Sequence, residues 1–474
     1  MTLNSFSFLV FFAGTLLLLW ILKLLLQKNR HFPVILRIFL VIAGYLFIAY
    51  ADIRYALCLF LFSLFTFFLG LLIRKYPEKK KPLMILGILV PLFFLGLFKY
   101  YNFFAGSFCR LIGRNYHSLG LLLPLGISFY TFSAIGYLID LYRGKYSACT
   151  SFTEFLLYMG FFPKLISGPI MRFDDFKREL SGMLLLNPKD FEAGIQIFVI
   201  GMFKKMVLAD HLNIFVNDVF SAPKAFHSLT VLWAVITYSL QIYFDFSGYS
   251  DMAIGSARML GFHLPKNFNF PYLSSNLTEF WKRWHITLSS WLQEYVYYSL
   301  GGNRKGRVRT YVNLLLTMVI GGLWHRVAWT FLVWGALHGI GLILHKLHLK
   351  YGISKGCKAG RLFCMLFTFG YASLCWVFFR ADSLSEAWLV LTQLFSFQTG
   401  ILQPYTWTFF SLLLLIACSI YYFIKKQTFA KNAKICYPVL PLNKVWGLTV
   451  FFLLCGLTIG LAYAGNTAFI YGAF

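Results

Sequence analysis

Residues 310–345 read TYVNLLLTMVIGGLWHRVAWTFLVWGALHGIGLILH, and basic residues flank this stretch at both ends. Because Lys and Arg collect in loops on the cytoplasmic side of a membrane, we expect both ends to lie inside. The 14 residues from Tyr311 to Trp324 rise about 21 Å as a helix, less than the roughly 30 Å hydrocarbon core. The stretch therefore predicts a helical hairpin that holds His325 and Arg326 at depth, near its apex.

The composition extends this prediction to the whole chain. Of 474 residues, 59% are hydrophobic and 13% are charged, and this charged share is about half the usual one. So few charges cannot cover a water-soluble surface, and 54 Phe and 12 Trp exclude intrinsic disorder. We expect an all-α polytopic membrane protein of about ten to twelve transmembrane helices, with further re-entrant or interfacial helices. The expected organisation is a single membrane-embedded domain, residues 1–474.

The net charge of +26 arises from short basic clusters between apolar runs. Such clusters, for example in 74–81 and 304–309, are typical of cytoplasmic loops, and no nucleic-acid-binding motif accompanies them. The lipid bilayer is therefore the expected partner, and nucleic acid is not. With the basic loop 425–444 inside, the last span near 446–464 ends outside. Both termini are predicted to be extracytoplasmic.

Two segments depart from simple membrane spans. Residues 155–170 carry a Pro–Lys pair at Lys164 and a Gly–Pro pair in one short apolar run, which interrupts a helix. We expect this segment to be re-entrant or to line a cavity, with Lys164 as a possible tunnel or substrate contact. Residues 278–298 repeat aromatic and apolar side chains at helical spacing, and this pattern predicts an amphipathic helix at the membrane interface.

His325 is the candidate catalytic residue of the predicted hairpin. Acyl transfer to a hydroxyl needs a base for the proton of the attacking oxygen, and burial keeps an imidazole neutral and able to accept it. From the residues alone, a structural histidine that hydrogen-bonds a backbone carbonyl is the alternative. For His285 the alternative is an ordinary histidine on an amphipathic helix, and for His338 it is a helix-packing residue. No H-E-x-x-H motif is present, and the nine Cys form no ligand pattern, so we expect no metal site.

Two carboxylates stand in the apolar run 243–255, YFDFSGYSDMAIG. Asp245 and Asp251 are six residues apart, about 240° around a helix, and so do not share a face. Paired-carboxylate catalysis is not expected for this reason. A structural polar network around a cavity is the preferred interpretation.

Together these stretches resemble the membrane-bound O-acyltransferase family, most closely its bacterial alginate O-acetyltransferase-like branch. The similar region is about 124–345, and the resemblance implies a ring of transmembrane helices around a central funnel, with the catalytic residues at a constriction. The stretches that carry it are PLGISFYTFSAIGYLIDLYRG (124–144), FFPKLISGPIMRF (161–173), YFDFSGYSDMAIGSARMLGF (243–262), NFNFPYLSSNLTEFWKRWHITLSSWLQEYVYYSLGGNRKG (267–306) and LLLTMVIGGLWHRVAWTFLVWGALHG (314–339).

The resemblance implies roles for individual residues. The G-L-W-H motif of the family falls on His325 and its R-W-H motif on His285, so both are implied to be catalytic. Trp324, Arg326 and His338, the last within a W-G-x-x-H-G pattern, are implied as possible tunnel or substrate contacts. The family usually continues W-H-G, whereas this chain has Arg326. Its guanidinium could meet a phosphate or the developing oxyanion, or its bulk could narrow the passage.

The C-terminal GNTAFIYGAF resembles the F-x-Y-x-x-F ending of this branch, which falls on Phe469, Tyr471 and Phe474. Placed outside, this tail could relay an acyl group through the Tyr471 hydroxyl or dock a secreted partner. An aromatic anchor at the membrane interface is the alternative.

The function implied by the resemblance is a membrane O-acyltransferase of the bacterial cytoplasmic membrane. It would move an acyl group, acetyl from the donor substrate acetyl-CoA, across the membrane without a permanently bound cofactor. The acceptor would be an extracytoplasmic polysaccharide, served by a secreted or periplasmic hydrolase-like acetyltransferase. The alternative is a transporter or scaffold for cell-envelope polymer export without acyl chemistry. The glycan, and the choice between acetyl and D-alanyl, stay open.

Overall fold

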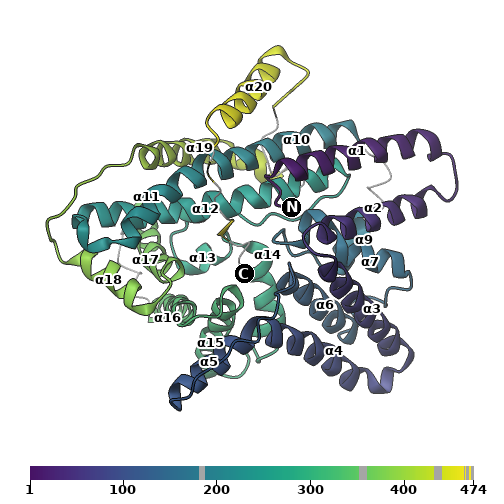
Figure 1. The fold of residues 1–474 in the computed structure, drawn as a ribbon, viewed down its shortest axis with the longest axis horizontal. Coiled ribbons are helices and arrows are strands. Elements are labelled where there is room, and N and C mark those ends of the chain that lie inside the picture. The colour runs from purple at the N-terminus through teal and green to yellow at the C-terminus, as the bar shows by residue number, and fades with distance from the viewer. Residues whose placement is uncertain (181–186, 352–359, 432–439, 464, 466–468, 471–474) are drawn as a thin grey trace. The chain divides into compact units, whose positions relative to one another are not determined.

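The computed structural model describes residues 1–180, 187–351, 360–431, 440–463, 465 and 469–470. All regular elements in these ranges are helices (Figure 1), apart from one isolated bridge between Phe226 and Ile401, so the all-α prediction is confirmed. Seven helices in the described part are long and apolar enough to cross a membrane. They are α1 (Phe6–Leu26), α2 (Phe32–Ala49), α3 (Ile53–Lys75), the composite Pro77–Leu111, α12 (Ser228–Met259), α16 (Trp329–Tyr351) and α17 (Arg361–Arg380).

The chain is thus a multi-pass membrane protein. Three shorter apolar helices accompany the seven long ones, and the total of ten to twelve crossings stays a prediction. The described chain forms two compact units. The first comprises Met1–Phe198 and Met252–Pro265, and the second comprises Val199–Asp251 and Lys266–Phe474. The organisation as a single membrane domain likewise stays a prediction.

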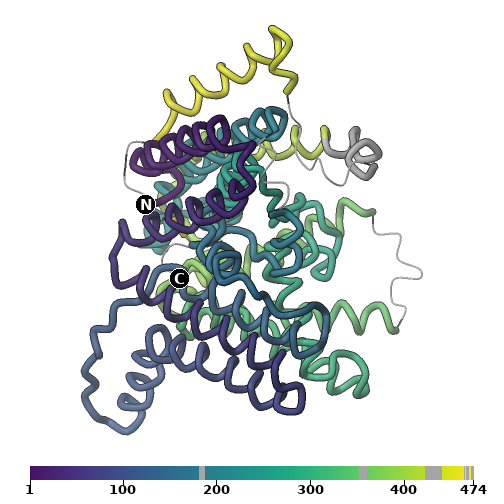
Figure 2. Tube along the Cα trace, turned by 90° about the vertical axis from the view of Figure 1, so that its right-hand side faces the viewer, coloured from purple at the N-terminus to yellow at the C-terminus, as the bar shows by residue number. Residues whose placement is uncertain are grey.

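The first unit is built mainly from the N-terminal helices, which lie beside one another in chain order, as the purple-to-blue tube in Figure 2 shows. Apolar residues all around α1 and α3 leave many side chains exposed, as expected for helices that face lipid. The other elements of this unit are η1 (Pro77–Lys79), α4 (Lys80–Leu95), η2 (Gly96–Tyr100), α5 (Tyr101–Leu111), α6 (Ile127–Tyr142), α7 (Phe152–Gly160), α8 (Phe162–Leu165), α9 (Phe173–Glu179) and most of α10 (Pro188–Met202).

The irregular segment 155–170 is confirmed as a broken helix. Helix α7 ends at Gly160, and Pro163 falls within the first turn of the four-residue α8, where a missing N–H costs nothing. Lys164 lines a cavity of about 10 Å³, and its Nζ lies 4.2 Å from the centroid of the Tyr158 ring. Lys164 thus lines a small cavity within the first unit, and a role for it as a tunnel or substrate contact stays a prediction.

The second unit contains the predicted catalytic residues. Its elements are η4 (Phe203–Ala209), α11 (Asp210–Ser221), η5 (Pro223–Ala225), α12 up to Asp251, η6 (Pro271–Leu273), α13 (Leu277–Trp281), α14 (Ile286–Trp291), η7 (Leu292–Tyr297), α15 (Arg307–His325), α16, α17, α18 (Leu384–Phe395), α19 (Thr406–Lys431) and α20 (Val445–Gly460). Segments η4 and η7 are π-helical turns, which are frequent at functional sites.

The predicted hairpin is present as α15 and α16, joined by a short turn after His325. Glycines let the two helices approach closely. A Cβ on Gly322 would meet the carbonyl oxygen of Phe331, and one on Gly335 would meet that of Met318. With 19 residues, α15 rises about 27 Å from its basic start to His325. Helix length and glycine packing together fix the position of His325.

The prediction of one amphipathic interfacial helix over 278–298 is wrong. The structure divides this stretch into α13, α14 and η7, with a sharp change of direction at His285. The backbone N–H of Ile286 donates to the carbonyl oxygen of Asn267, so a remote loop captures the chain at this point. Trp281 and Leu288 of this stretch are buried inside the protein instead of facing lipid headgroups.

Candidate active site

His325 ends α15 inside an aromatic enclosure. The residue is 2% exposed. Its ring lies 5.4 Å from that of Trp334, nearly perpendicular to it, and 5.4 Å from that of Phe379. The preceding Trp324 packs at 4.9 Å. These aromatic rings form the surroundings of His325 among the described residues.

His285 occupies a strained backbone position. Its φ of 41° and ψ of 55° are left-handed, which is uncommon for a residue other than glycine. Its Nδ1 lies 3.2 Å from Oδ1 of Asn267, and the same Oδ1 accepts hydrogen bonds from the hydroxyl and the backbone N–H of Thr287. The Asn267 Oδ1 accepts from the Thr287 N–H, so it is an oxygen and can only accept from His285 as well. The proton of the neutral His285 ring is therefore on Nδ1, and Nε2 is the acceptor nitrogen.

The fold brings the two predicted catalytic histidines together. Their ring centroids are 6.4 Å apart, although they belong to different elements, α15 and the start of α14. A strained backbone and two buried histidines that meet at one point are typical of a site where proton transfer occurs.

His338 is separated from His325 by the ring of Trp334. It is fully buried on α16, and Trp334 contacts both His338, at 4.9 Å, and His325. Trp281 packs against His338 at 5.1 Å, edge to face. Neither ring nitrogen of His338 has a hydrogen-bond partner among the described residues. A predicted contact with substrate by His338 thus stays a prediction, and its observed contacts are aromatic.

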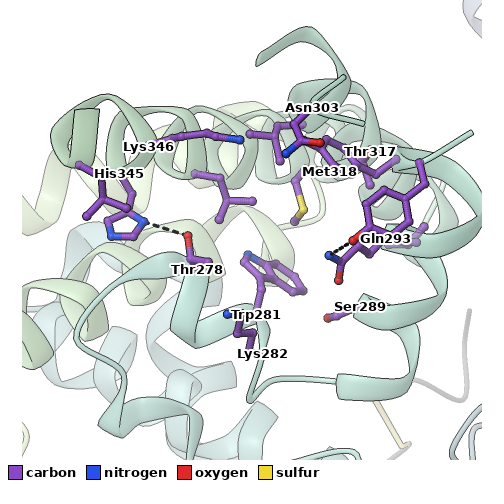
Figure 3. A pocket seen from close by; sticks show the side chains of 16 residues that line it. Thr278, Trp281, Lys282, Ser289, Gln293, Asn303, Thr317, Met318, His345 and Lys346 are labelled. Atoms are coloured by element: carbon purple, nitrogen blue, oxygen red, sulfur yellow. Dashed lines mark hydrogen bonds between the residues drawn. The ribbon is translucent and has the colours of Figure 1, made fainter. Parts of the chain in front are cut away.

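A cavity of about 450 Å³ opens beside this aromatic wall (Figure 3). We call it the basic cavity. Trp281 is common to its lining and to the contacts of His338. His345 shares a 2.8 Å hydrogen bond with Thr278 across one end, and the dashed line in Figure 3 marks it. The lining includes Thr278, Trp281, Lys282, Asn303, His345 and Lys346.

A second cavity, of about 380 Å³, lies beside the C-terminal end of α15. We call it the polar chamber; its lining includes Asn213, Gln241, Arg326, Phe379, Arg380 and Ile470. Arg326 follows His325 directly, and Phe379 touches the His325 ring. The Arg326 guanidinium forms a 2.9 Å ion pair with Asp382. Arg326 therefore turns to the α17–α18 connection, and a role for it in binding phosphate or an oxyanion stays a prediction.

The described part of the C-terminal tail returns to this region. Phe469 is buried and stacks on Tyr249 with 4.2 Å between centroids. Ile470 lines the polar chamber. The interfacial-anchor alternative is thus wrong for Phe469, because its ring packs against α12. Tyr471 and Phe474 lie outside the described residues.

Sequence reasoning missed two residues of this site, Asn267 and Trp334, and the contact that Asp245 makes with the tail. Asn267 orients His285, Trp334 separates His325 from His338, and Asp245 binds the tail through a 2.8 Å hydrogen bond from the Ile470 N–H. Asn267 stands in the NFNFP stretch that carried the family resemblance, but a lone Asn gives no signal by itself. Lys164 belongs to the first unit, and its described contacts are with Tyr158 and Phe176.

The chain is similar to several proteins named for acyl transfer. It is 39% identical over 367 residues to a probable alginate O-acetylase of Pseudomonas aeruginosa, covering 76% of this chain and 70% of that protein. It is 36% identical over 392 residues to the peptidoglycan O-acetyltransferase of Helicobacter pylori, covering 77% and 74%. A teichoic acid D-alanyltransferase of Streptococcus thermophilus is 34% identical over 248 residues, covering 48% and 58%.

Residues 147–351 match the membrane-bound O-acyltransferase family, and this range contains His285, His325 and His338. The family predicted from the motifs is therefore confirmed. Together with two relatives aligned over three quarters of its length, the match shows that the chain belongs to the membrane-bound O-acyltransferase family and is an O-acyltransferase.

Proposed function

We propose that this enzyme moves an acetyl group from cytoplasmic acetyl-CoA to the outer side of the bacterial cytoplasmic membrane, for O-acetylation of an extracytoplasmic polysaccharide. The observation that carries the proposal is the buried pair of His325 and His285, 6.4 Å apart, in a chain of this family. Acetyl is preferred over D-alanyl because the O-acetylating relatives align over 76–77% of the chain and the D-alanyl relative over 48%.

The proposed reaction begins with proton removal by His325. A ring nitrogen takes the proton of the acceptor hydroxyl while the oxygen attacks the thioester carbonyl carbon. A C–O bond forms and the C–S bond breaks. The imidazolium then returns its proton to the departing thiolate, so CoA leaves as a thiol. His285 orients the reacting groups, since Asn267 fixes its ring by a hydrogen bond to Nδ1.

The basic cavity is the proposed site for the donor. Lys282, Lys346 and His345 line it, and ammonium groups suit the phosphates of CoA. Trp281 forms part of the same lining and packs on His338, which in turn contacts Trp334 beside His325. Movement of these aromatic side chains would let the thioester reach the catalytic ring. The basic ends of α15 and α16 support a cytoplasmic opening.

The polar chamber is the proposed place where the acceptor hydroxyl arrives. Both chain termini are assigned to the outer side, and Ile470 of the C-terminal tail lines this chamber. Tyr471 follows directly and is proposed to receive the acetyl group on its hydroxyl. A secreted hydrolase-like transferase, docking on the tail through Tyr471 and Phe474, would then pass the group to the polysaccharide.

The test uses the full-length enzyme in proteoliposomes supplied with radiolabelled acetyl-CoA. We expect label on the C-terminal peptide, located by mass spectrometry. His325→Ala should slow labelling by about 10²- to 10⁴-fold, the usual contribution of a general base. The control is His117→Ala, an exposed histidine of the first unit, which should label normally. Full activity of His325→Ala would overturn the proposed function.

Other outcomes separate the parts of the proposal. Acetyl-CoA consumption that needs His325 but leaves Tyr471→Phe fully active would remove the tyrosine relay and retain the acyltransferase. Movement of a polysaccharide across vesicles without acyl transfer would instead identify a transporter. Loss of cellular function on deleting 469–474, with none in His325→Ala, would identify a scaffold.

A further inference from the structure

A buried cluster of three charged residues lies next to the tail. Lys205 belongs to η4, Asp210 to α11 and Asp245 to α12. The ammonium of Lys205 is 2.6 Å from Oδ1 of Asp245 and 2.7 Å from Oδ1 of Asp210. The Lys205 side chain is 3% exposed and that of Asp245 is 1% exposed. Lys205 reaches both carboxylates from the π-helical turn η4, whose widened backbone precedes Asp210. One ammonium shared by two carboxylates leaves negative charge available for a further hydrogen-bond donor.

That further donor is the tail. The backbone N–H of Ile470 donates a 2.8 Å hydrogen bond to Oδ2 of Asp245, whereas Lys205 binds Oδ1. One helical turn along α12, Tyr249 stacks on Phe469. Residues four apart face the same side of a helix, so Asp245 and Tyr249 form one docking strip for consecutive tail residues.

We propose that Asp245 is the positioning residue for the C-terminal tail, with Lys205 orienting its carboxylate. Asp245 and Tyr249, which we name the tail latch, hold residues 469 and 470, with Ile470 in the wall of the polar chamber. The latch rests on the proposed function, because it serves a tail that presents the acceptor hydroxyl. Asp245 acts through the tail backbone and contacts no reacting atom.

The chain offers a matched control for the carboxylate. Asp251 lies on the same helix, its side chain is 5% exposed, and its Oδ2 forms a 2.6 Å ion pair with Lys204, the neighbour of Lys205. Asp251→Asn therefore disturbs a buried ion pair of the same kind without touching the described tail. An effect specific to Asp245→Asn separates tail positioning from general loosening of α12.

The tail itself offers a second pair of variants. Ile470→Pro removes the N–H donor and leaves the whole ion cluster intact. Ile470→Ala keeps the N–H and removes only side-chain atoms. Since both changes lie in the tail, the fold of the helices does not depend on them, and they test the latch even where Asp245→Asn fails to fold.

The measurement is disulfide formation between cysteines placed at the stacked positions, Tyr249→Cys and Phe469→Cys, in full-length enzyme whose nine native Cys are replaced. These two substitutions remove the ring stacking, so the rate reports on the Asp245 hydrogen bond to the Ile470 N–H alone. We expect rapid cross-linking in this background and with Asp251→Asn or Ile470→Ala. With Asp245→Asn or Ile470→Pro the rate should fall about tenfold, since a charge-assisted hydrogen bond is lost. Equal rates in all variants, or equal losses in Asp245→Asn and Asp251→Asn, would overturn the latch.

Cross-linking needs no acyl donor, so its result does not depend on the proposed chemistry. Loss of cross-linking in Asp245→Asn together with unchanged acetyl transfer would retain the latch and overturn the tyrosine relay. Normal cross-linking with lost acetyl transfer would place Asp245 elsewhere in the reaction and overturn the latch.

Discussion

The ring centroids of His325 and His285 lie 6.4 Å apart, and the two residues have different backbone conformations. His325 is the last residue of a 19-residue helix, whereas His285 adopts a left-handed conformation just before a six-residue helix. A straight helix through His285, as its sequence predicts, would point this ring elsewhere. The break at His285 is therefore part of what assembles the site.

Asn267 should be needed for the orientation of His285. Replacing it by Ala removes acceptors for His285 and for two donors of Thr287, all buried. We expect a loss of about 1–3 kcal/mol in the free energy of unfolding, together with a lower kcat at unchanged KM for acetyl-CoA. Thermal unfolding in detergent and initial rates would measure both.

The matched control is Asn313→Ala. Asn313 is also fully buried, and its Nδ2 donates to the Leu300 and Gly302 carbonyls, away from the histidines. It should cost similar stability and leave the kcat of the folded fraction unchanged. Equal kcat losses in both variants would show that Asn267 only supports the fold.

Close packing of α15 against α16 should tolerate no added methyl group at Gly322. The Cβ of Gly322→Ala would meet the Phe331 carbonyl oxygen, a backbone atom that cannot rotate away. We expect destabilisation of about 1–3 kcal/mol, the usual cost of overpacking, and reduced activity because His325 lies one turn along. The control is Gly370→Ala on α17, where a Cβ meets nothing within 4 Å. A neutral Gly322→Ala would contradict the observed packing.

The basic cavity should set the affinity for the donor. Lys346→Gln and Lys282→Gln each remove one cation from the lining. We expect KM for acetyl-CoA to rise by up to about tenfold per substitution, equivalent to ~1.4 kcal/mol, with kcat retained and the effect diminishing at high salt. Lys350→Gln is the control, because its ammonium lies against Tyr351 outside this lining. An unchanged KM in both cavity variants would place the donor elsewhere.

The ion pair between Arg326 and Asp382 should affect the entry of water into the polar chamber more than the stability of the fold. Both side chains are about half exposed or more, at 46% and 67%, so breaking the pair should cost under about 1 kcal/mol. Since Arg326 lines the polar chamber beside His325, we expect Arg326→Gly to increase hydrolysis of acetyl-CoA by water. Thiol release without an acceptor would measure this.

A double-mutant cycle decides whether the pair or the arginine alone acts. If the pair closes the chamber, Asp382→Asn should raise hydrolysis as well, and the double variant should add little to either single change. Fully additive effects would show that Arg326 acts through its bulk and that Asp382 does not hold it in place.

The sequence alone determined the membrane class, the α15–α16 hairpin and the place of His325 at its end. These features follow from local quantities: apolar content, the length of a helix between basic flanks, and the position of an ionisable residue within it. Each is decided by solvation of consecutive residues, so a single chain reveals it without knowledge of distant contacts. The family motifs added the candidate roles of His285 and His338.

Only the tertiary structure decided which polar groups meet. Asn267 captures a chain 18 residues away and breaks the helix that periodicity favours around His285, and the tail reaches Asp245 across 225 residues. Hydrophobic periodicity records which face is buried but not which partner a buried polar atom finds. Because a hydrogen-bond partner stabilises a buried polar atom, the final path of the backbone, rather than local preference, placed His285 beside His325 and the tail beside the polar chamber.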